Sequence, residues 1–169
     1  MKRSPLTATT LLEKQHRKVE ATFKKLENKR TASLELLQEL ANDLAAHMAI
    51  EQEIFYPAVR EIDEDLILEA YEEHSLAELA IKRLMATELN DESFLARVTA
   101  AKELIEHHVK EEEEELFPEV EKALDEAKLA DLGQRMKERF DEVLTGGFEA
   151  AVPKGYNKTS ADMADKSAA

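Results

Sequence analysis

Apolar residues recur along most of the chain at alternating steps of three and four, which is the spacing of one face of an α-helix. Four such stripes precede residue 118, and each ends in a polar segment with turn-forming residues. The stripes consist of Leu12, His16, Val19, Phe23 and Leu26; of Leu37, Leu40, Leu44, His47, Glu51, Ile54 and Ala58; of Ile67, Tyr71, His74, Glu78, Ile81 and Met85; and of Phe94, Val98, Ala101, Ile105, His108, Glu112 and Leu116. The pattern therefore predicts four amphipathic helices.

Residues that commonly cap helices stand before each stripe. The candidate caps are Thr7, Thr9 or Thr10 for the first helix, Thr31 or Ser33 for the second, Asp63 or Asp65 for the third and the segment 90–93 for the fourth. The connections between stripes are short, and short connections favour antiparallel neighbours. We therefore predict an all-α fold, an antiparallel up-down-up-down four-helix bundle.

A further helical pattern follows Pro118, with apolar residues from Leu129 to Val143, and Gly146-Gly147 supplies a C-cap. We predict an additional C-terminal helix that packs on the bundle or, alternatively, offers a surface to a partner. Bundle and extra helix would form one domain over residues 1–147. The remaining residues, 148–169, contain Pro153, Gly155 and many small polar residues, which predicts a flexible tail.

The composition excludes several classes of protein. The formal net charge of the 169 residues is −14, which disfavours nucleic acids and anionic membrane surfaces as partners. The absence of cysteine excludes disulfides and thiolate metal sites. No apolar run approaches the roughly 20 residues of a membrane span, and the polar Thr7-Ala8-Thr9-Thr10 is unlike a signal-peptide core. We therefore expect a cytoplasmic protein without a membrane partner.

Ionisable residues interrupt the apolar stripes. Four of the five histidines lie on them, as do Glu51, Glu78 and Glu112, whereas no Lys or Arg occupies a stripe position. A single histidine on such a stripe is most often a satisfied core residue. Several carboxylates in a bundle core without cationic partners would each cost several kcal/mol, on the order expected for buried charge, unless they were protonated or held cations. The combination therefore favours a metal site.

The same short pattern occurs twice. His47 and His108 are each followed by a glutamate after four residues and a proline after ten, and the two copies are 61 residues apart. On a helix, positions i and i+4 share a face, so each copy presents an imidazole beside a carboxylate. His16 precedes His47 by 31 residues and His74 precedes His108 by 34, which predicts a pseudo-twofold bundle. The fifth histidine, His107, lies about 100° around the helix from His108 and is expected to face away.

Imidazole and carboxylate ligands without sulfur suit iron, manganese or zinc, and several of each fit two ions better than one. With these motifs the chain resembles the hemerythrin family, in particular the bacterial HHE cation-binding domains, over about residues 7 to 118. The resemblance implies an oxo- or hydroxo-bridged centre of two iron ions, with His16 and His47 on one iron, His74 and His108 on the other, and Glu51 and Glu112 bridging. It makes Glu78 a seventh candidate ligand. The set of candidate metal ligands is His16, His47, Glu51, His74, Glu78, His108 and Glu112.

Two departures bear on function. Oxygen-carrying hemerythrins have a second histidine where this chain has Glu78, and an aspartate five residues after the last histidine where this chain has Glu112 after four. A more anionic centre would stabilise ferric iron. We therefore expect a protein that binds or senses oxygen, peroxide or a small diatomic ligand. The alternatives are an enzyme that turns over peroxide or nitric oxide, an iron-handling protein, and a metal-free interaction module that uses the helix from Leu129 to Leu144.

Overall fold

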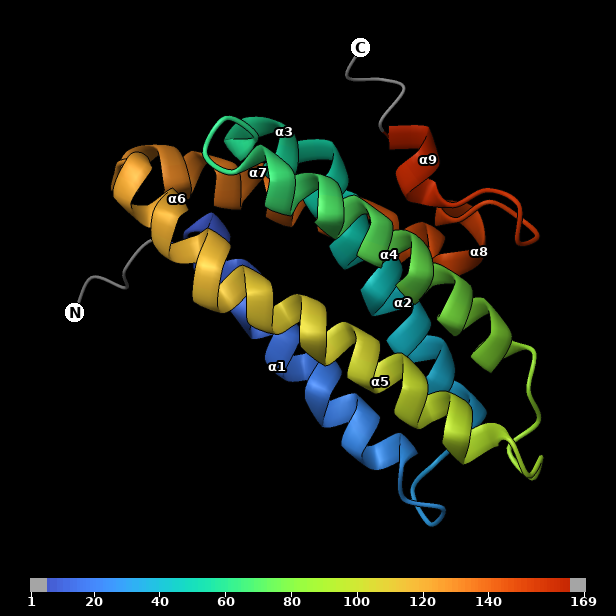
Figure 1. Cartoon of the computed structure of the whole chain (residues 1–169). Helices are drawn as coiled ribbons and strands as arrows, with labels where there is room; N and C mark the ends of the chain where they lie inside the picture. Colours follow the sequence, from blue (N-terminus) through green and yellow to red (C-terminus); the bar gives the residue numbers. More distant parts are fainter. Residues whose placement is uncertain (1–5, 165–169) are drawn as a thin grey trace.

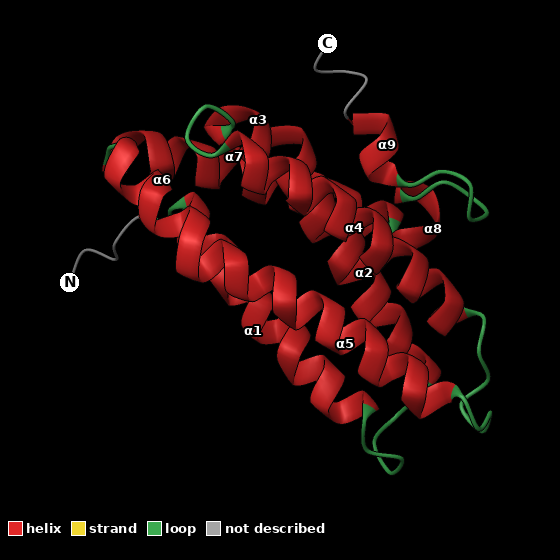
Figure 2. Cartoon of the chain, in the orientation of Figure 1, coloured by secondary structure: helices red, strands yellow, loops and turns green. Residues whose placement is uncertain are grey.

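A computed structural model describes residues 6–164 of the chain, and every regular element among them is helical (Figures 1 and 2). The all-α class is thereby confirmed. In Figure 1 the long helices lie side by side, and the chain reverses direction from each one to the next. Four of these helices form the bundle: α1 (Ala8–Leu26), α2 (Leu34–Ile50), α4 (Glu64–Met85) and α5 (Phe94–Glu111). Helix α1 contacts α2 and α5, and α4 contacts the same two helices.

Local capping sets where these helices begin. Thr7 and Thr10 exchange hydrogen bonds, since each hydroxyl accepts the backbone N–H of the other residue at 3.1 to 3.3 Å. Ser33 accepts the N–H of Leu36 before α2, and Asp63 accepts the N–H of Leu66 before α4. Each cap satisfies a backbone donor that the first helical turn leaves unpaired.

Both helices that carry a His-xxx-Glu pattern widen into a π-helical turn at the glutamate. These turns are η1 (Glu51–Phe55), which leads into α3 (Tyr56–Val59), and η2 (Glu112–Leu116), which leads into α6 (Phe117–Ala123). In each, a backbone N–H reaches back five residues to the carbonyl of the glutamate, from Tyr56 to Glu51 and from Phe117 to Glu112. A proline without an N–H follows each of these donors, which accounts for the matching positions of the two turns.

The π turn changes which residues face the core beyond Glu51. The sequence pattern predicts Ile54 and Ala58 on the buried face, but Ala58 is exposed and Ile54 is only half-buried. Phe55, Tyr56 and Val59 occupy the interior instead. The prediction was wrong here because a π turn holds one residue more than an α turn and rotates the following side chains around the axis.

The additional helix, α7 (Glu126–Gly146), packs against α1 and α2. It begins after Asp125, whose carboxylate accepts the N–H of Lys128, and it ends at Gly147, whose φ of 74° suits glycine. Gly133 permits a close approach, since a Cβ there would lie 2.4 Å from the carbonyl oxygen of Leu6. The apolar face of α7 consists of the buried residues Leu129, Leu132, Met136 and Val143. Other helices of the same chain, mainly α1 and α2, cover this face.

The segment for which the sequence predicts a flexible tail contains two short helices, α8 (Phe148–Ala151) and α9 (Ser160–Ala164). Phe148 and Val152 join the core that α2 and α4 help to form, and α9 contacts α4. The polar composition predicted a flexible segment, but burial of these few apolar side chains against the core stabilises an ordered one. Residues 165–169 of the expected tail lie outside the described residues, as do residues 1–5.

The apolar core consists of two clusters. One contains Val19, Leu44, Ala77 and Ile105, and the other contains residues such as Leu12, Phe55, Ile67 and Leu116. On α1, α2 and α4 a histidine lies between residues of one cluster and residues of the other, and His108 lies between Ile105 of the first cluster and Leu116 of the second, so a polar layer separates the two.

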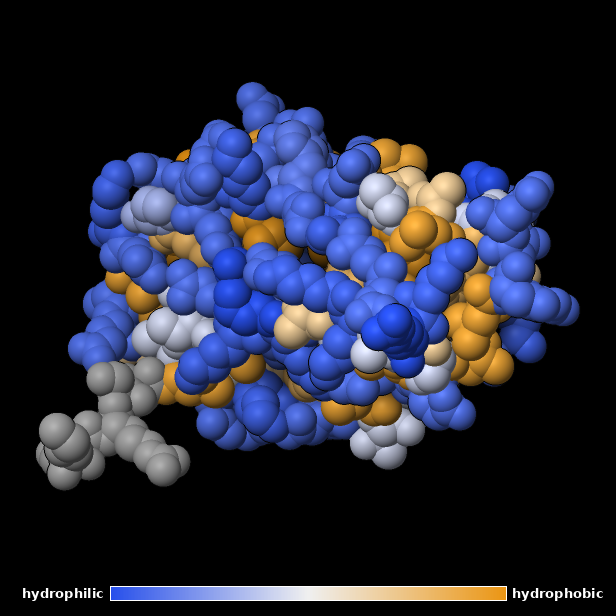
Figure 3. Space-filling view, turned by 90° about the horizontal axis from the view of Figure 1, so that it is seen from below, coloured by the Kyte–Doolittle hydropathy of each residue, from blue (hydrophilic) through white to orange (hydrophobic). Residues whose placement is uncertain are grey.

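The face seen in Figure 3 is mostly hydrophilic, with apolar residues visible between the polar ones. Among the described residues, no helix combines the length and the apolar character that crossing a membrane requires.

Candidate metal centre

Four histidines, one from each long helix, meet in the polar layer between the two apolar clusters. His16, His47, His74 and His108 are all buried, with exposed fractions of 2% to 6%. The rings form two edge-on pairs: the centroids of His16 and His47 are 4.9 Å apart, and those of His74 and His108 are 4.7 Å apart. The first pair is the one that α1 and α2 bring together, and the second belongs to α4 and α5.

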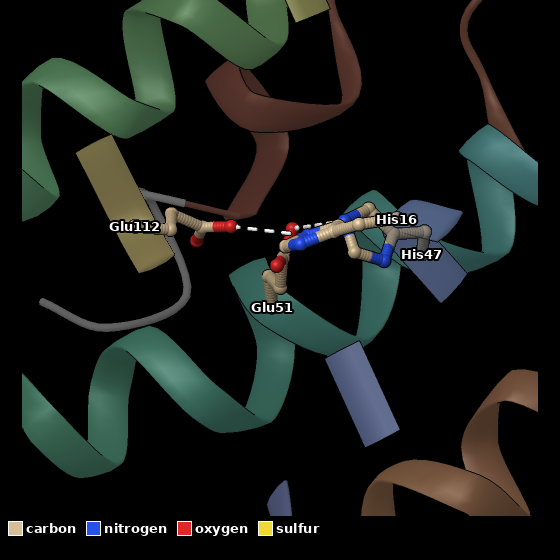
Figure 4. A group of neighbouring side chains, drawn as sticks. All are labelled: His16, His47, Glu51 and Glu112. Atoms are coloured by element: carbon tan, nitrogen blue, oxygen red, sulfur yellow. Dashed lines mark ion pairs between the residues drawn. The ribbon is translucent and has the colours of Figure 1, made fainter. Parts of the chain in front are cut away.

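Two carboxylates connect the histidine pairs. Glu51 Oε2 lies 3.2 Å from Nε2 of His47 and 3.2 Å from Nε2 of His74. Glu112 Oε2 lies 3.3 Å from Nε2 of His16 and 3.6 Å from Nε2 of His108. Figure 4 shows the side chains of His16, His47, Glu51 and Glu112 pointing toward one another. Each carboxylate therefore contacts one histidine from each of the two pairs.

The outer nitrogen of every ring has an oxygen partner. Nδ1 of His16 lies 2.8 Å from Glu113 Oε1, and Nδ1 of His108 lies 2.7 Å from Glu73 Oε2. The other two rings are held by amide oxygens: Nδ1 of His47 lies 2.8 Å from Gln15 Oε1, and Nδ1 of His74 lies 3.2 Å from Gln52 Oε1.

These partners decide the tautomer of the rings. A carboxylate or amide oxygen only accepts hydrogen bonds, so each Nδ1 must carry the proton. In a neutral imidazole the lone pair is then on Nε2, the atom that faces the carboxylates. Nε2 of His74 and Nε2 of His108 lie only 3.0 Å apart. Two lone pairs at this distance repel each other unless a proton or a cation lies between them.

Burial controls the charge of these groups. It lowers the pKa of His47 and of His74 well below the usual value, and the neighbouring imidazoles add to the effect. Burial, followed by the charge of Glu112, raises the pKa of Glu51. Burial opposes ionisation of Glu112 as well, but the adjacent His108 and His16 hold its pKa below the usual range. His47 and His74 are therefore held in the neutral form that binds metals.

The site contains buried atoms that lack hydrogen-bond partners. Among the described residues, these atoms include Nε2 of His16, both carboxylate oxygens of Glu51 and Oε2 of Glu112. Leaving such groups unpaired costs about 1–3 kcal/mol each, and more for charged groups. A bound cation would satisfy all of them at once, so the residues present fit a metal. The ligand atoms fall into two groups, each within 4.8 Å: His16, His47, Glu51 and Glu112; and Glu51, His74 and His108.

Tyr56 adds a hydroxyl to this layer. Its side chain is fully buried, and its Oη donates to Glu112 Oε1 at 2.8 Å. The same oxygen lies 3.2 Å from Nε2 of His74 and 3.4 Å from Nε2 of His108. Burial and the charges of Glu112 and Glu51 raise the pKa of the phenol well above its usual value, so the proton stays on the oxygen.

The structure does not bring Glu78 together with the other candidate ligands. Its Oε2 accepts from the backbone N–H and the hydroxyl of Ser160, and its Oε1 pairs with Lys82 at 2.7 Å. Glu20, the equivalent position on the first helix, pairs with Arg17. Tyr71 donates to the carbonyl of Gln52 at 3.1 Å.

A small cavity of about 20 Å³ adjoins the four imidazoles. Its remaining walls are mainly apolar and come from the cluster that includes Val19, Leu44 and Ile105. This volume is enough for one water-sized molecule.

Sequence reasoning missed Tyr56 and the four residues that hold the outer ring nitrogens. A signal for the latter exists in the repeat itself. Gln15 and Glu73 each precede the histidine of the first helix in a pair, and Gln52 and Glu113 each follow the glutamate of the second. No such signal marks Tyr56, whose place depends on the π turn.

Comparison with known proteins agrees with this geometry. The family model of the hemerythrin HHE cation-binding domain matches residues 7–120. The crystal structure of an HHE cation-binding domain-containing protein from Mycobacterium kansasii superimposes with a TM-score of 0.73 at 26% sequence identity, covering 83% of this chain and 88% of that one. No curated protein matches the sequence significantly. Because the family model spans well over half of the residues, the chain belongs to the hemerythrin HHE cation-binding domain family.

Proposed function

We propose that this protein is a non-haem di-iron protein that binds or senses oxygen or a related small oxidant. His16 and His47 would hold one iron, His74 and His108 the other, and Glu51 and Glu112 would bridge them within an antiparallel four-helix bundle. The observation that carries the proposal is the position of the two carboxylates, because each of them contacts one histidine from each of the two pairs.

The donor chemistry supports iron. Imidazole and carboxylate ligands without sulfur suit iron, manganese and zinc, and such mixed sets with open positions are typical of non-haem iron. Pairs of iron or manganese ions are also held by Glu and His in the cores of helix bundles. Two divalent or trivalent ions also compensate the charges of Glu51 and Glu112, which no described Lys or Arg pairs with.

Tyr56 is positioned to contribute to the same centre. Its hydroxyl lies within 3.4 Å of Nε2 of both His74 and His108, the two nitrogens assigned to one iron. We include it as an additional ligand of that iron. Glu78 is excluded from the proposed ligand set because Lys82 and Ser160 already occupy both of its oxygens.

The iron pair, when bound, would supply electrons and open positions to a small oxidant. The chain's own residues supply the rest. Gln15, Gln52, Glu73 and Glu113 fix the rings by accepting the Nδ1 hydrogens, which also raises the basicity of Nε2. The apolar walls of the cavity beside the imidazoles exclude bulk water, and its volume of about 20 Å³ admits only a very small ligand.

Metal analysis with an absorption spectrum tests the proposal. Protein expressed in iron-supplemented medium is expected to carry two irons per chain and to show near-ultraviolet oxo-to-iron bands. His47→Ala should lose iron and the bands, whereas Thr22→Ala, a buried substitution on α1 outside the site, should keep both. Recovery of zinc alone, or of no metal, would contradict the assignment.

A second candidate function is turnover of peroxide or nitric oxide by the same centre. The buried phenol of Tyr56 favours it, because its hydroxyl donates to Glu112 Oε1 at 2.8 Å within the site and turnover of peroxide needs a proton source. Assays of peroxide and nitric oxide consumption distinguish the two: a bound adduct without turnover supports binding or sensing, and turnover that His47→Ala abolishes supports an enzyme.

A further inference from the structure

A second cluster of metal-ligand side chains lies at the surface beside the buried centre. Its members are Glu73 on α4 and His107 and Glu111 on α5, and their ligand atoms all lie within 4.8 Å of one another. Nε2 of His107 is 3.5 Å from Glu73 Oε1 and 3.3 Å from Glu111 Oε1. His107 and Glu111 repeat the His-xxx-Glu spacing one residue before His108 and Glu112, so this second face of α5 presents the same pair of ligands outward.

Two carboxylate oxygens of the cluster lack hydrogen bonds. Oε2 of Glu111 is inaccessible to solvent and has no hydrogen-bond partner among the described residues. The Glu73 side chain is about nine-tenths buried, and its Oε1 points to His107 without accepting a hydrogen bond from any described group. Oε1 of Glu73 and the other oxygen of Glu111, Oε1, both face Nε2 of His107, so a cation among these three residues would bind both carboxylates.

The surroundings of the cluster are acidic. Glu69, Glu73 and Glu115 all act on Glu111 as nearby negative charges. In the described part of the chain, no Lys or Arg pairs with Glu73 or Glu111, and the ion pairs that these two residues form are with histidines. The field at this point therefore attracts cations and has no basic side chain to neutralise it.

The cluster is open to solvent, unlike the inner centre. The His107 side chain is 59% exposed, whereas that of His108, one residue later, is 8% exposed. Glu73 connects the two sites, because its Oε1 faces His107 and its Oε2 accepts from Nδ1 of His108. One carboxylate thus belongs to the surface cluster and supports a ligand of the buried one.

We propose that Glu73, His107 and Glu111 form a third cation site, at the surface, for a divalent first-row transition ion. One imidazole and two carboxylates suit Mn²⁺, Fe²⁺ or Zn²⁺ better than Mg²⁺, which prefers oxygen ligands alone. This site is separate from the two iron positions proposed above, and only its connection to the inner centre through Glu73 rests on that proposed function.

Titration of iron-loaded protein with Mn²⁺, followed by electron paramagnetic resonance, tests the site. We expect one Mn²⁺ to bind per chain in addition to the iron. His107→Ala and Glu111→Gln should each weaken this binding at least tenfold while leaving iron content and the near-ultraviolet spectrum unchanged. The matched control is Glu114→Gln, which removes the same charge from a residue on the same segment that is 65% exposed and lies outside the cluster.

Two results would overturn the site. One is that the wild-type protein binds no additional Mn²⁺. The other is that Glu114→Gln weakens binding as much as Glu111→Gln does, which would show general attraction to an acidic surface. Failure of the di-iron assignment gives a different result: Mn²⁺ that enters the inner centre would still bind to His107→Ala and would be lost in His47→Ala.

Discussion

Tyr56 Oη lies 2.8 Å from Glu112 Oε1, and both groups belong to the buried layer that holds the four histidines. Without metal the phenol keeps its proton, because burial and the nearby carboxylates raise its pKa. A bound cation reverses that effect by stabilising the phenolate. We therefore expect iron-loaded protein to show a visible phenolate-to-iron band that Tyr56→Phe removes while both irons remain. Identical visible spectra would mean that Tyr56 acts only as a hydrogen-bond donor to Glu112.

Because Gln15 holds the imidazole of His47, replacing Gln15 should lower the metal affinity although no metal ligand is removed. Gln15→Leu leaves Nδ1 of His47 without its acceptor at 2.8 Å, so the ring is free to rotate or to change tautomer. Removing such a partner typically costs about 10–100-fold in metal affinity. Competition with an iron chelator measures the change. Gln15→Glu keeps an acceptor and should restore affinity, and Lys14→Leu, an exposed neighbour, should have no effect.

The helix periodicity and the short connections were sufficient to predict the all-α class and the positions of α1, α2, α4 and α5. The same periodicity placed His16, His47, His74 and His108 on buried faces, because a 3.6-residue repeat decides burial wherever a helix is regular. It failed beyond Glu51. There the π turn shifted burial to Phe55 and Tyr56, and no hydrophobic pattern reports an extra residue in a turn.

The distinction between Glu51 and Glu78 was only partly visible in the sequence. Both lie on stripes, four residues after a histidine, and both are completely buried. One difference is local, since Lys82 lies four residues after Glu78 and pairs with it, whereas Phe55 stands four residues after Glu51. The other difference is tertiary, since Glu78 also meets Ser160, which is 82 residues away. A residue so distant along the chain leaves no trace in the local pattern around Glu78.

This difference yields a prediction for Glu78→Gln. The substitution should leave two irons bound, since the carboxylate does not reach the inner centre. It should lower stability by about 3–5 kcal/mol, because Lys82 loses a buried ion-pair partner. Iron analysis of the folded protein and thermal denaturation measure the two effects. Loss of one iron in protein that remains folded would restore Glu78 as a ligand.

Adding a side chain at Gly133 should destabilise the fold at a place outside the metal site. A Cβ there would lie 2.4 Å from Leu6 O, 2.8 Å from the carbonyl carbon of Thr7 and 2.9 Å from the N of Ala8, all backbone atoms. Gly133→Ala must therefore push α7 away from the start of α1, at a cost of about 1–3 kcal/mol. Gly146→Ala is the control: its Cβ would meet only Ala150 Cβ at 3.4 Å. Denaturant unfolding of both variants measures the difference, and equal stability would mean that the two helices pack less closely than described.

The effect of Glu51→Gln on the stability of the fold should change sign when metal binds. In metal-free protein, burial and Glu112 raise the pKa of Glu51 above the ordinary value of 4.5. The folded state then binds a proton that the unfolded state has released, so this group lowers stability as pH rises above about 4.5. Glu51→Gln cannot ionise and escapes this loss. We expect the metal-free variant to be more stable than metal-free wild type at pH 7, by roughly 1–3 kcal/mol, the usual cost of an unpaired buried polar group.

The advantage of Glu51→Gln should shrink as pH falls toward 4.5 and disappear below it, where the wild-type carboxyl becomes protonated in both states. Comparing the two metal-free proteins at each pH cancels the opposite contribution of His47 and His74, whose lowered pKa values reduce stability below about pH 6.5. With iron present the order should reverse, because the introduced amide can no longer bridge and the metal stabilises only the wild type. Denaturant unfolding with and without chelator measures both orders. A variant that is less stable than wild type in both conditions would show that Glu51 is not strained by burial and that its carboxylate has another role.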